Sequence, residues 1–526
     1  MKKLGFIILL AAGINSCNPS AEEGTNNELY IIPQPREIRI QGKAFEIDPH
    51  TTIRADEDLM ILAGQLKAYL SSATGISLEI NKRRHGGKQI ELKIDKEIAA
   101  MGDEAYIISS SSRKVQIKAA KGTGIFYGIQ TLRQLVPPRM EETSVTERSN
   151  IVRIPQLSVV DGPRFSWRGL MLDCSRTFWD KEYIKKTIRL LAYYKMNVLH
   201  LHLSDDQGWR LQIDQYPELT QKGAQFPEKW NEPRERQGFY SKDDIREIIA
   251  YAELHHVTVV PEIEMPGHSL AVLACYPDLS CTGGPFEIHP FFKGPGIHED
   301  ILCAGNDKTF VFLENVLGEV FELFPSGYIH IGGDEAPKAR WEVCEKCQSR
   351  IAEEGLKDEH ELQSWFIKRM EEYIKRSGKK LIGWDEILEG GISPTATVMY
   401  WRGWLDNVPG EIISKGNHII MSPTTHCYFD YDYKTISTLK AYEFEPVPPG
   451  LSAEQSKKVL GIQANFWSHI DRTETGVDRQ LYPRLLSISE VGWIPESNKD
   501  TARFKEKVQN HLLRLEHFQV SYNSRW

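Results

Sequence analysis

The sequence predicts an α/β protein, namely a (β/α)8 TIM barrel preceded by a small α+β accessory domain. From Arg168 onward, eight short apolar segments alternate with amphipathic helical segments. Near-continuous apolar strands are typical of parallel sheets covered on both faces, and parallel strands need long connections. The preceding segment instead mixes short strands, turns and two helical stretches. At 526 residues the chain is long enough for both units.

The first 17 residues indicate export. A basic MKK start precedes an apolar stretch, residues 4–13, that is too short to span a bilayer. The segment 1–17 resembles a bacterial lipoprotein signal, in which Cys17 becomes the lipidated first residue of the mature chain. Plain secretion with an incidental cysteine is the alternative. We expect an exported protein, in the periplasm or at the outer membrane or cell surface, that touches the membrane only through a lipid on Cys17.

A polar linker, residues 18–27, leads into the accessory domain, residues 28–160. Its expected strands are YIIPQP, LEI, IELKI, AYIIS and KVQIKAA, because short apolar runs alternate there with turns. Its expected helices are LMILAGQLKAYLSSATG and TGIFYGIQTLRQLV, which repeat apolar residues at helical spacing. No pattern in this domain indicates chemistry.

The barrel is expected over residues 161–526, including a C-terminal helix. Its eight strand segments are RGLMLD, NVLHLHL, VTVVPEIE, YIHIGG, KKLIGWD, ATVMYW, HIIMS and KVLGIQANFW. Helical segments such as KEYIKKTIRLLAYYKM and KDDIREIIAYAELHH separate them. Barrels of this kind carry their sites at the C-terminal ends of the strands.

Acids, arginines and tryptophans collect at those strand ends. Tryptophan faces pack against the C–H groups of sugars, while carboxylates and arginine bind hydroxyls, so this combination is typical of a carbohydrate site. The residues concerned are Asp173, Arg176, Asp205, Asp206, Glu264, His268, Asp334, Glu335, Trp384, Asp385, Glu386, Trp401, Arg402, Tyr428, Asp430, Trp467 and His469.

Composition excludes several classes of protein. The formal net charge is -8, so there is no basic balance that would favour nucleic acid. A hydrophobic share of 41% with 26% charged residues is ordinary for a globular protein and excludes a membrane bundle or a disordered chain.

Cysteine spacing leaves one pairing as the preferred prediction. Removing Cys17 from the eight cysteines leaves seven, so at least one thiol stays free or pairs with another chain. Cys281 and Cys303 flank a Gly/Pro-rich loop, and we expect them to form a disulfide. Cys344 and Cys347 have the spacing of a zinc or redox motif, but no second pair follows them, so a structural role without metal is expected.

Six motifs together carry a family resemblance. They are HIGGDEAP, LHLSDDQGWR, PEIEMPGH, GWDE, YWRG and GIQANFW. With them the chain resembles glycoside hydrolase family 20, the β-N-acetylhexosaminidases, and the accessory domain resembles that family's usual N-terminal domain. The resemblance implies a retaining exo-enzyme that removes terminal β-linked GlcNAc or GalNAc from glycans without a cofactor or metal. Its oligomeric state is not predicted.

The resemblance also explains the adjacent acids of HIGGDEAP. Neighbouring strand residues point to opposite faces, so adjacent acids would not normally flank one scissile bond as the two carboxylates of a double displacement do. In this family the substrate's own acetamido oxygen attacks the anomeric carbon. Glu335 matches the general acid and base, Asp334 the residue that orients the acetamido N–H and stabilises the oxazolinium intermediate, and Tyr428 the hydroxyl that holds the acetamido carbonyl.

The remaining roles are carried over by position. Trp384, Trp401 and Trp467 match the aromatic walls around the sugar. Arg176 matches the ligand of the O3 and O4 hydroxyls, and Asp430 resembles a further hydroxyl ligand. The residues expected beneath the catalytic acid, where they could tune its proton affinity, are Asp205, His268 and Glu264.

Two positions depart from the family pattern. His469 stands where an acid usually binds a hydroxyl of the terminal sugar, which suggests an altered preference at O4 or O6, such as tolerance for an acidic substituent. Glu264 stands where aspartate is commoner, and its extra methylene could shift the residues under the acid.

Three alternatives remain open at this stage. His200 and His202 could belong to a metal-dependent barrel hydrolase, although histidines are missing from the fifth and sixth strand ends and hydrogen bonding inside the barrel is expected instead. The chain could be a non-catalytic surface glycan-binding lipoprotein. It could also be a disaccharide-releasing, lacto-N-biosidase-like member of the same family.

Overall fold

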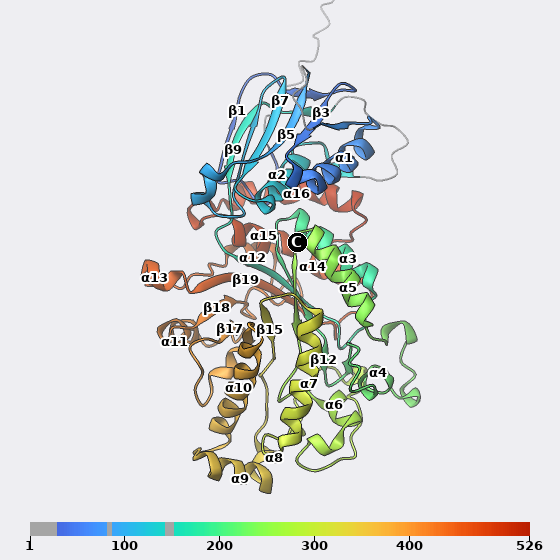
Figure 1. Ribbon diagram of the computed structural model, residues 1–526, viewed down its shortest axis with the longest axis vertical. Coiled ribbons are helices and arrows are strands. Elements are labelled where there is room, and N and C mark those ends of the chain that lie inside the picture. Colours follow the sequence, from blue (N-terminus) through green and yellow to red (C-terminus); the bar gives the residue numbers. More distant parts are fainter. Residues whose placement is uncertain (1–28, 82–86, 142–151) are drawn as a thin grey trace, which may run out of the picture.

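The computed structural model describes residues 29–81, 87–141 and 152–526. The expected signal segment, 1–17, and the linker, 18–27, lie outside the described residues. Two domains stack along the long axis of the molecule, with the accessory domain at the top of Figure 1 and the barrel below it. No helix in the described ranges is both long enough and apolar enough to cross a bilayer.

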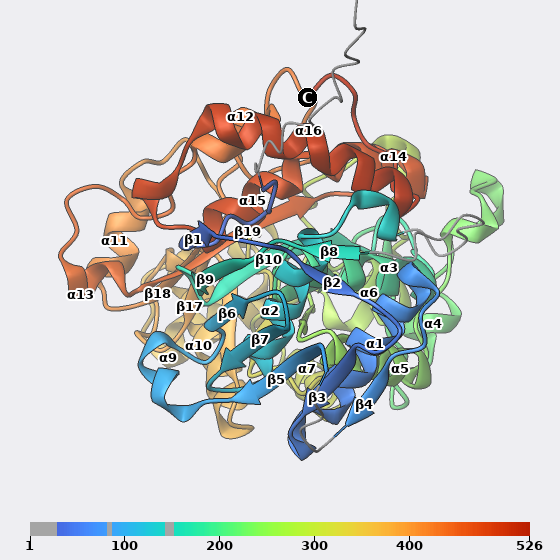
Figure 2. The same cartoon turned by 90° about the horizontal axis from the view of Figure 1, so that it is seen from above.

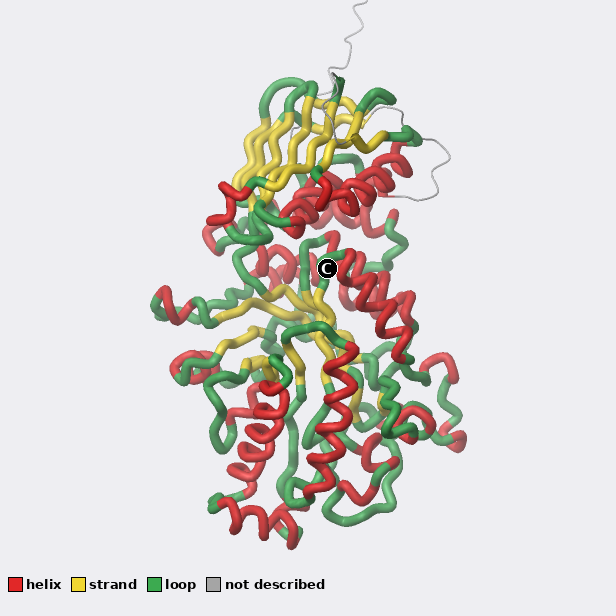
Figure 3. Tube along the Cα trace, in the orientation of Figure 1, coloured by secondary structure: helices red, strands yellow, loops and turns green. Residues whose placement is uncertain are grey.

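The accessory domain is a mixed sheet covered on one face by helices. The sheet order is β1-β9-β6-β7-β5-β3-β4. Helices α1 (Met60–Thr74) and α2 (Gly122–Gln134) pack on the face turned toward the barrel, as Figure 3 shows. The strands are β1 (Glu37–Ile40), β3 (Thr52–Ala55), β4 (Glu79–Asn81), β5 (Gln89–Ile94), β6 (Tyr106–Ser110), β7 (Lys114–Ala119) and β9 (Leu157–Asp161), with β2 (Phe45–Ile47) and β8 (Val152–Ile154) as a separate pair.

The expected YIIPQP strand is wrong. This segment has no regular secondary structure, and the first strand begins at Glu37. Pro33 and Pro35 lack the N–H groups that a sheet ladder needs. The buried Ile32 instead hydrogen-bonds, through its N–H and its carbonyl, to the side chain of Gln134 at the end of α2.

Eight parallel strands close the barrel, and all eight expected strand segments are confirmed. Each strand pairs with the next along the chain, and the first pairs with the last. The strands are β10 (Trp167–Asp173), β11 (Val198–His202), β14 (Thr258–Glu262), β15 (Tyr328–His330), β16 (Lys380–Trp384), β17 (Thr397–Tyr400), β18 (His418–Met421) and β19 (Val459–Phe466).

The connecting helices begin at well-formed caps. The Asp180 side chain accepts from the N–H of Tyr183 at the start of α3, and Ser241 with Asp244 forms a capping box on α5. The main helices are α3 (Lys181–Tyr193), α5 (Lys242–Leu254), α7 (Asp307–Leu323), α10 (Glu359–Arg376), α11 (Val408–Ser414), α12 (Thr438–Glu443), α14 (Glu474–Leu481), α15 (Arg484–Trp493) and α16 (Thr501–His517).

Long excursions follow the second, third and fourth strands, at the end of the barrel far from the accessory domain (Figure 1). A small hairpin, β12 (Ser204–Asp205) with β13 (Gly208–Trp209), follows β11. The loop after β14 contains α6 (Leu270–Cys275), and the loop after β15 contains α8 (Ala339–Glu342) and α9 (Glu345–Glu354). These excursions surround the strand ends where the sequence places the site.

Helix α16 and a buried ion pair join the two domains. Figure 1 shows α16 between the accessory domain and the barrel, and Figure 2 shows it from above, beside α12 and α14. Its Arg514 donates to the carbonyls of Gln134 and Val136. Lys195 of the barrel lies 3.1 Å from Asp161 at the end of β9, and both side chains are fully buried. The joint is therefore polar, buried and specific.

Candidate active site

A pocket of about 290 Å³ opens at the C-terminal ends of the barrel strands. That volume is at the lower end of the range for small-ligand pockets. The lining residues are Arg176, Asp205, Glu264, His268, Pro295, Asp334, Glu335, Trp401, Thr424, Tyr428, Asp430, Tyr431, Trp467 and His469. Of the twelve residues that were assigned roles from the sequence, all but Trp384 line this pocket.

The turn after β15 places both adjacent acids in the same pocket. Strand β15 ends at His330, and Gly332 and Gly333 then have φ of 65° and 89°. A Cβ at Gly332 would lie only 1.7 Å from a carboxylate oxygen of Glu264, so only glycine fits. Glu335 itself is left-handed, with φ of 44°. Because the backbone here is not extended, strand alternation does not separate the two carboxyls.

Asp334 is buried and available to a ligand. Its side chain is 8% exposed, and no hydrogen-bond partner of its Oδ1 is found in the described part of the chain. Burial raises the pKa of the Asp334 carboxyl well above its usual value, although the nearby His268 opposes the rise. A buried acceptor without a partner is costly, so a substrate N–H that bonds it would remove that cost.

Glu335 is more open and is held from two sides. Its side chain is 32% exposed, and its Oε2 lies 3.4 Å from Nε2 of His268. Its backbone N–H donates to the Glu386 carboxylate at 2.9 Å, which fixes the turn. The carboxyl can therefore exchange a proton with a group in the pocket while its backbone stays in place.

His268 connects Glu335 to acids that follow β11. Its Nδ1 lies 3.4 Å from Asp205 and 3.2 Å from Asp206, while Nε2 faces Glu335. Burial alone would lower the pKa of His268, but Asp205 outweighs it and raises that pKa well above its ordinary value. The imidazolium thus lies between the buried acids and the open one.

Arg176 is fixed by two buried carboxylates. Its guanidinium lies 2.7 Å from Asp205 and 3.3 Å from Asp173, and it covers the ring of Trp467 at 4.9 Å. Burial would lower the pKa of Arg176, but the Asp205 and Asp173 carboxylates outweigh it and raise that pKa. The Nε atom has no partner within the described ranges, which leaves a donor for substrate hydroxyls.

Three aromatic side chains form one wall. Trp401 and Tyr428 stack with ring centres 6.2 Å apart, and Tyr428 lies 6.3 Å from Trp467. Trp384 is not among the lining residues. It is fully buried in the barrel with its ring centre 6.0 Å from that of Trp467, so it supports the wall from beneath.

Glu264, Asp430 and His469 complete the lining with side-chain atoms that lack partners in the described structure. Burial raises the pKa of Glu264 well above its usual value, and it raises the pKa of Asp430 to about 7. Burial, aided by the charge of Arg176, lowers the pKa of His469. The His469 ring is therefore neutral at pH 7 and can accept a hydrogen bond through one nitrogen.

His200 and His202 hydrogen-bond inside the barrel, as expected. His202 contacts Glu262 and, at 2.9 Å, Asp205, while His200 lies 3.2 Å from Glu262 and accepts from Gln463. Both imidazoles are fully buried. They link the barrel interior to the acids under the pocket.

The expected Cys281–Cys303 disulfide is wrong in this structure. The seven cysteines in the described part of the chain are free thiols. Cys281 and Cys303 do approach one another, but so do Cys344 and Cys347, and the four sulfurs form one group. No second pair follows Cys344 and Cys347 in the sequence, but Cys281 and Cys303, which precede them, join them in space.

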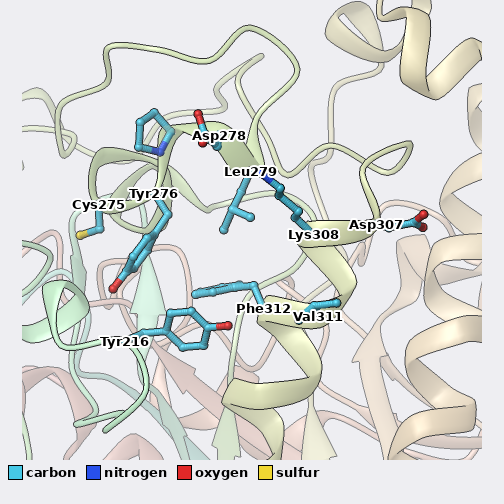
Figure 4. Close-up of a pocket in the computed structure, with 10 residues that line it drawn as sticks. Tyr216, Cys275, Tyr276, Asp278, Leu279, Asp307, Lys308, Val311 and Phe312 are labelled. Atoms are coloured by element: carbon cyan, nitrogen blue, oxygen red, sulfur yellow. The ribbon is translucent and has the colours of Figure 1, made fainter.

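A larger cavity of about 620 Å³ lies elsewhere, between α6 and α7 (Figure 4). Tyr216, Tyr276 and Phe312 form much of its lining, and it shares no lining residue with the pocket that holds Asp334 and Glu335. Size alone therefore does not identify the site here, because the smaller pocket holds the convergent acids.

Family models match most of the chain. Residues 165–496 match the catalytic domain of glycosyl hydrolase family 20, and residues 28–162 match domain 2 of the same family. The chain belongs to glycosyl hydrolase family 20. It is a glycosidase of the β-N-acetylhexosaminidase type, which excludes the non-catalytic glycan-binding alternative.

Individual relatives of this family 20 enzyme agree. The β-hexosaminidase of Porphyromonas gingivalis is 39% identical over 544 residues, covering 99% of this chain and 69% of that protein. The family 20 β-N-acetylhexosaminidase structure from Streptomyces coelicolor A3(2) superposes with a TM-score of 0.82 at 31% identity, over 94% of this chain and 97% of that one. A Streptomyces plicatus β-hexosaminidase mutant, solved with its product GlcNAc, gives 0.82 at 31% identity, over 94% and 96%.

Some lining residues were missed from the sequence. Pro295, Thr424 and Tyr431 reach the pocket from loops and belong to no motif. Tyr431 follows Tyr428 by three residues, and this spacing was the one sequence feature that could have indicated a place for Tyr431 in the pocket. Glu386 was noted at a strand end, but its contact with the backbone of Glu335 could not be read from the motif GWDE.

Proposed function

We propose that this family 20 enzyme removes a terminal β-linked N-acetylhexosamine by substrate-assisted catalysis, with Glu335 as acid and base and Asp334 as the partner of the acetamido group. The observation that carries these assignments is the turn after β15. It places two adjacent carboxyls in one pocket: the more exposed one lies beside an imidazole, and the buried one has an oxygen, Oδ1, without a hydrogen-bond partner among the described residues.

The division of roles follows from the two environments. Glu335 is open to the pocket and protonates the leaving oxygen, then takes a proton from the attacking water. The buried Asp334 accepts the acetamido N–H and stabilises the positive charge of the oxazolinium. The Tyr428 hydroxyl holds the acetamido oxygen for attack on the anomeric carbon, which forms the new C–O bond as the leaving group departs.

The sugar is bound by the remaining walls. Trp401 and Trp467 pack against its C–H faces, and Arg176 with Asp430 binds hydroxyls. The small volume supports release of a single terminal sugar rather than a disaccharide. Product bound to a relative of this fold is likewise the monosaccharide GlcNAc.

Two substrates with different leaving groups test the role of Glu335. A para-nitrophenolate leaves readily without protonation, whereas a sugar alkoxide does not. For Glu335→Gln we expect kcat on chitobiose to fall by about 10²–10⁴-fold, with a smaller loss on para-nitrophenyl N-acetyl-β-glucosaminide. The exposed Glu454→Gln variant should retain both activities. Equal losses of Glu335→Gln on both substrates would contradict the assignment.

His469 supports a proposal about specificity at O4 or O6. Its neutral imidazole lines the pocket with Nδ1 lacking a partner in the described structure, and Arg176 is the nearby positive charge. We expect His469→Glu to change the ranking of gluco, galacto and O6-sulfated substrates, with the sulfated substrate losing most. An unchanged ranking would remove His469 from the specificity determinants.

Export and lipidation of Cys17 remain proposals that rest on the sequence. The basic start, the short apolar stretch and Cys17 support them. In a bacterial host, radiolabelled palmitate should enter the wild-type chain but not Cys17→Ser, and activity should fractionate with membranes only for the former. Labelling of both chains, or of neither, would exclude lipidation at Cys17.

A further inference from the structure

Four cysteines from the loops after β14 and β15 converge. Cys281 and Cys303 come from the loop after β14, whereas Cys344 and Cys347 come from the start of α9 after β15. Their sulfurs all lie within 4.8 Å of one another. Cys303 lies 3.6 Å from Cys347 and 3.8 Å from Cys344, and Cys281 lies 3.8 Å from Cys347.

These distances fit a metal site and not a disulfide. A disulfide joins its sulfurs at about 2.05 Å. Four thiolates around a tetrahedral Zn²⁺, each at about 2.3 Å, lie about 3.8 Å from one another. The observed separations of 3.6 to 3.8 Å are close to this second value, and one sulfur, that of Cys303, has two others at such distances. Disulfide bonding joins sulfurs in pairs, but here the Cys303 sulfur has two neighbouring sulfurs within 3.8 Å.

The surroundings suit negatively charged sulfur. Gly305, two residues after Cys303, packs against the backbone of Lys346 and Cys347. A Cβ at Gly305 would lie 2.1 Å from the Lys346 backbone, so glycine is required for this close approach. Cys344 is the N-cap of α9, whose N-terminal N–H groups favour negative charge, and the Arg340 guanidinium interacts with Cys281.

Burial and ligand type further define the site. Cys303 and Cys347 are fully buried, Cys344 is 8% exposed, and Cys281 is partly buried. Four sulfur ligands leave no open coordination position, so the site is structural and not catalytic. All-thiolate tetrahedral sites select zinc over hard cations such as Mg²⁺ or Ca²⁺.

We propose that Cys281, Cys303, Cys344 and Cys347 bind one Zn²⁺ that fastens the loop after β14 to the loop after β15. The first loop carries His268, and the segment between Cys281 and Cys303 contributes Pro295 to the pocket lining. The second loop follows directly from Asp334 and Glu335. The metal therefore holds together the two segments that carry the acid and its imidazole partner.

Metal content and thiol state test this proposal together. The full chain, purified without chelator, should contain about one zinc ion per chain by elemental analysis. Mass spectrometry under denaturing conditions should show all cysteines reduced. Replacement with Co²⁺ should give the intense visible bands of a tetrahedral cobalt tetrathiolate. A chain without zinc, whether its mass is lower by two hydrogens per disulfide or its four thiols are free, would overturn the proposal.

Variants assign the metal to these residues. Cys281→Ser changes the most accessible ligand and should reduce zinc at least about tenfold while the chain still folds, as judged by circular dichroism. Cys275→Ser is the matched control, because Cys275 lines the separate cavity of Figure 4 and lies outside the group of four. Retention of zinc by Cys281→Ser, or equal loss in both variants, would also overturn the assignment.

Discussion

At the scale of single residues, the two adjacent acids differ in burial and therefore in chemistry. Asp334 is 8% exposed and Glu335 is 32% exposed by its side chain. Asp334 is thus suited to holding a group of the bound substrate, and Glu335 to exchanging protons with the leaving group and water. The left-handed backbone at Glu335 makes this arrangement feasible.

Asp334→Asn should reduce kcat far more than it raises KM. An amide can still contact the acetamido group, but it carries no charge to stabilise the oxazolinium, so we expect a loss of about 10²–10³-fold in kcat. Affinity for a charged thiazoline mimic of the intermediate should fall in parallel. A variant that lost only substrate affinity would contradict the role of Asp334, and steady-state kinetics with both ligands decides the question.

Asp430 gives a pH dependence that binding can detect. Burial raises the pKa of Asp430 to about 7, so the carboxyl ionises as pH rises from 6 to 8. Because a carboxylate accepts hydroxyl hydrogen bonds more strongly than a neutral acid, GlcNAc should bind about fivefold more tightly at the higher pH. Tryptophan fluorescence titrations measure this change. Asp430→Asn should lack the step, and persistence of the step would assign it to another group.

At the scale of elements, three strand ends share one chain of acids and imidazoles. His202 at the end of β11 contacts Asp205 in the following hairpin, which contacts His268 after β14, which faces Glu335 after β15. These loops are separate in sequence, so the contact of His268 with Glu335 depends on how they are held together.

Asp205→Asn should lower the pKa of His268 by about one unit or more. Asp205 is the largest influence that raises this pKa against burial. A raised histidine pKa stabilises the fold fully below about pH 6.5, and this contribution is lost as pH rises through the folded-state pKa. NMR titration of labelled histidine measures the shift. Exposed Asp214→Asn serves as the control, and an unchanged His268 in Asp205→Asn would contradict the link.

The elements differ in how far the sequence predicts them. The eight barrel strands are long apolar runs, and their pattern is unambiguous. In the accessory domain, β1 (EIRI) and β9 (LSVVD) are only four and five residues long and mix polar with apolar residues, and neither was predicted. YIIPQP, which is more apolar, was predicted as a strand although its prolines prevent pairing. Burial by a neighbouring domain thus makes a segment apolar without making it a strand.

The site shows the same limit. Motifs placed Asp334, Glu335, Arg176 and Trp467 in one pocket because the ends of parallel strands meet there. They did not place Pro295, which reaches the pocket from a long loop, and they placed Trp384 in a wall that it only supports. The cysteine group was missed because Cys281 and Cys303 come before Cys344 and Cys347, whereas a second pair was sought only after them. The two pairs are also separated by about 40 residues of sequence.

At the scale of the whole molecule, the two domains are joined by buried charge. Lys195 contacts Asp161 and the hydroxyl of Tyr106, and both charged side chains are inaccessible to solvent. Asp161 also accepts from Nε1 of Trp493 in α15. The accessory domain is therefore held to the barrel by buried charged groups, and removing one of them would leave the other buried without its partner.

Lys195→Met should destabilise the protein by about 3–5 kcal/mol, because it leaves the Asp161 carboxylate buried without its cation. The double variant Lys195→Met/Asp161→Asn should recover part of this loss. Urea denaturation followed by tryptophan fluorescence measures both. Lys121→Met, which breaks an exposed pair with Asp103, is the matched control and should leave the midpoint unchanged. Wild-type stability of Lys195→Met would show that the joint does not depend on this pair.

The pairing of β10 with β19 has a consequence for biosynthesis. The first barrel strand completes its hydrogen bonds only when the last one, ending at Phe466, has emerged, some 300 residues later. The Trp467 ring, which the guanidinium of Arg176 covers, is synthesised directly after β19. Since chains are made from the N-terminus, no nascent fragment shorter than this contains a finished sugar pocket. The sugar pocket is therefore incomplete, and the enzyme inert, until β19 and Trp467 have been synthesised.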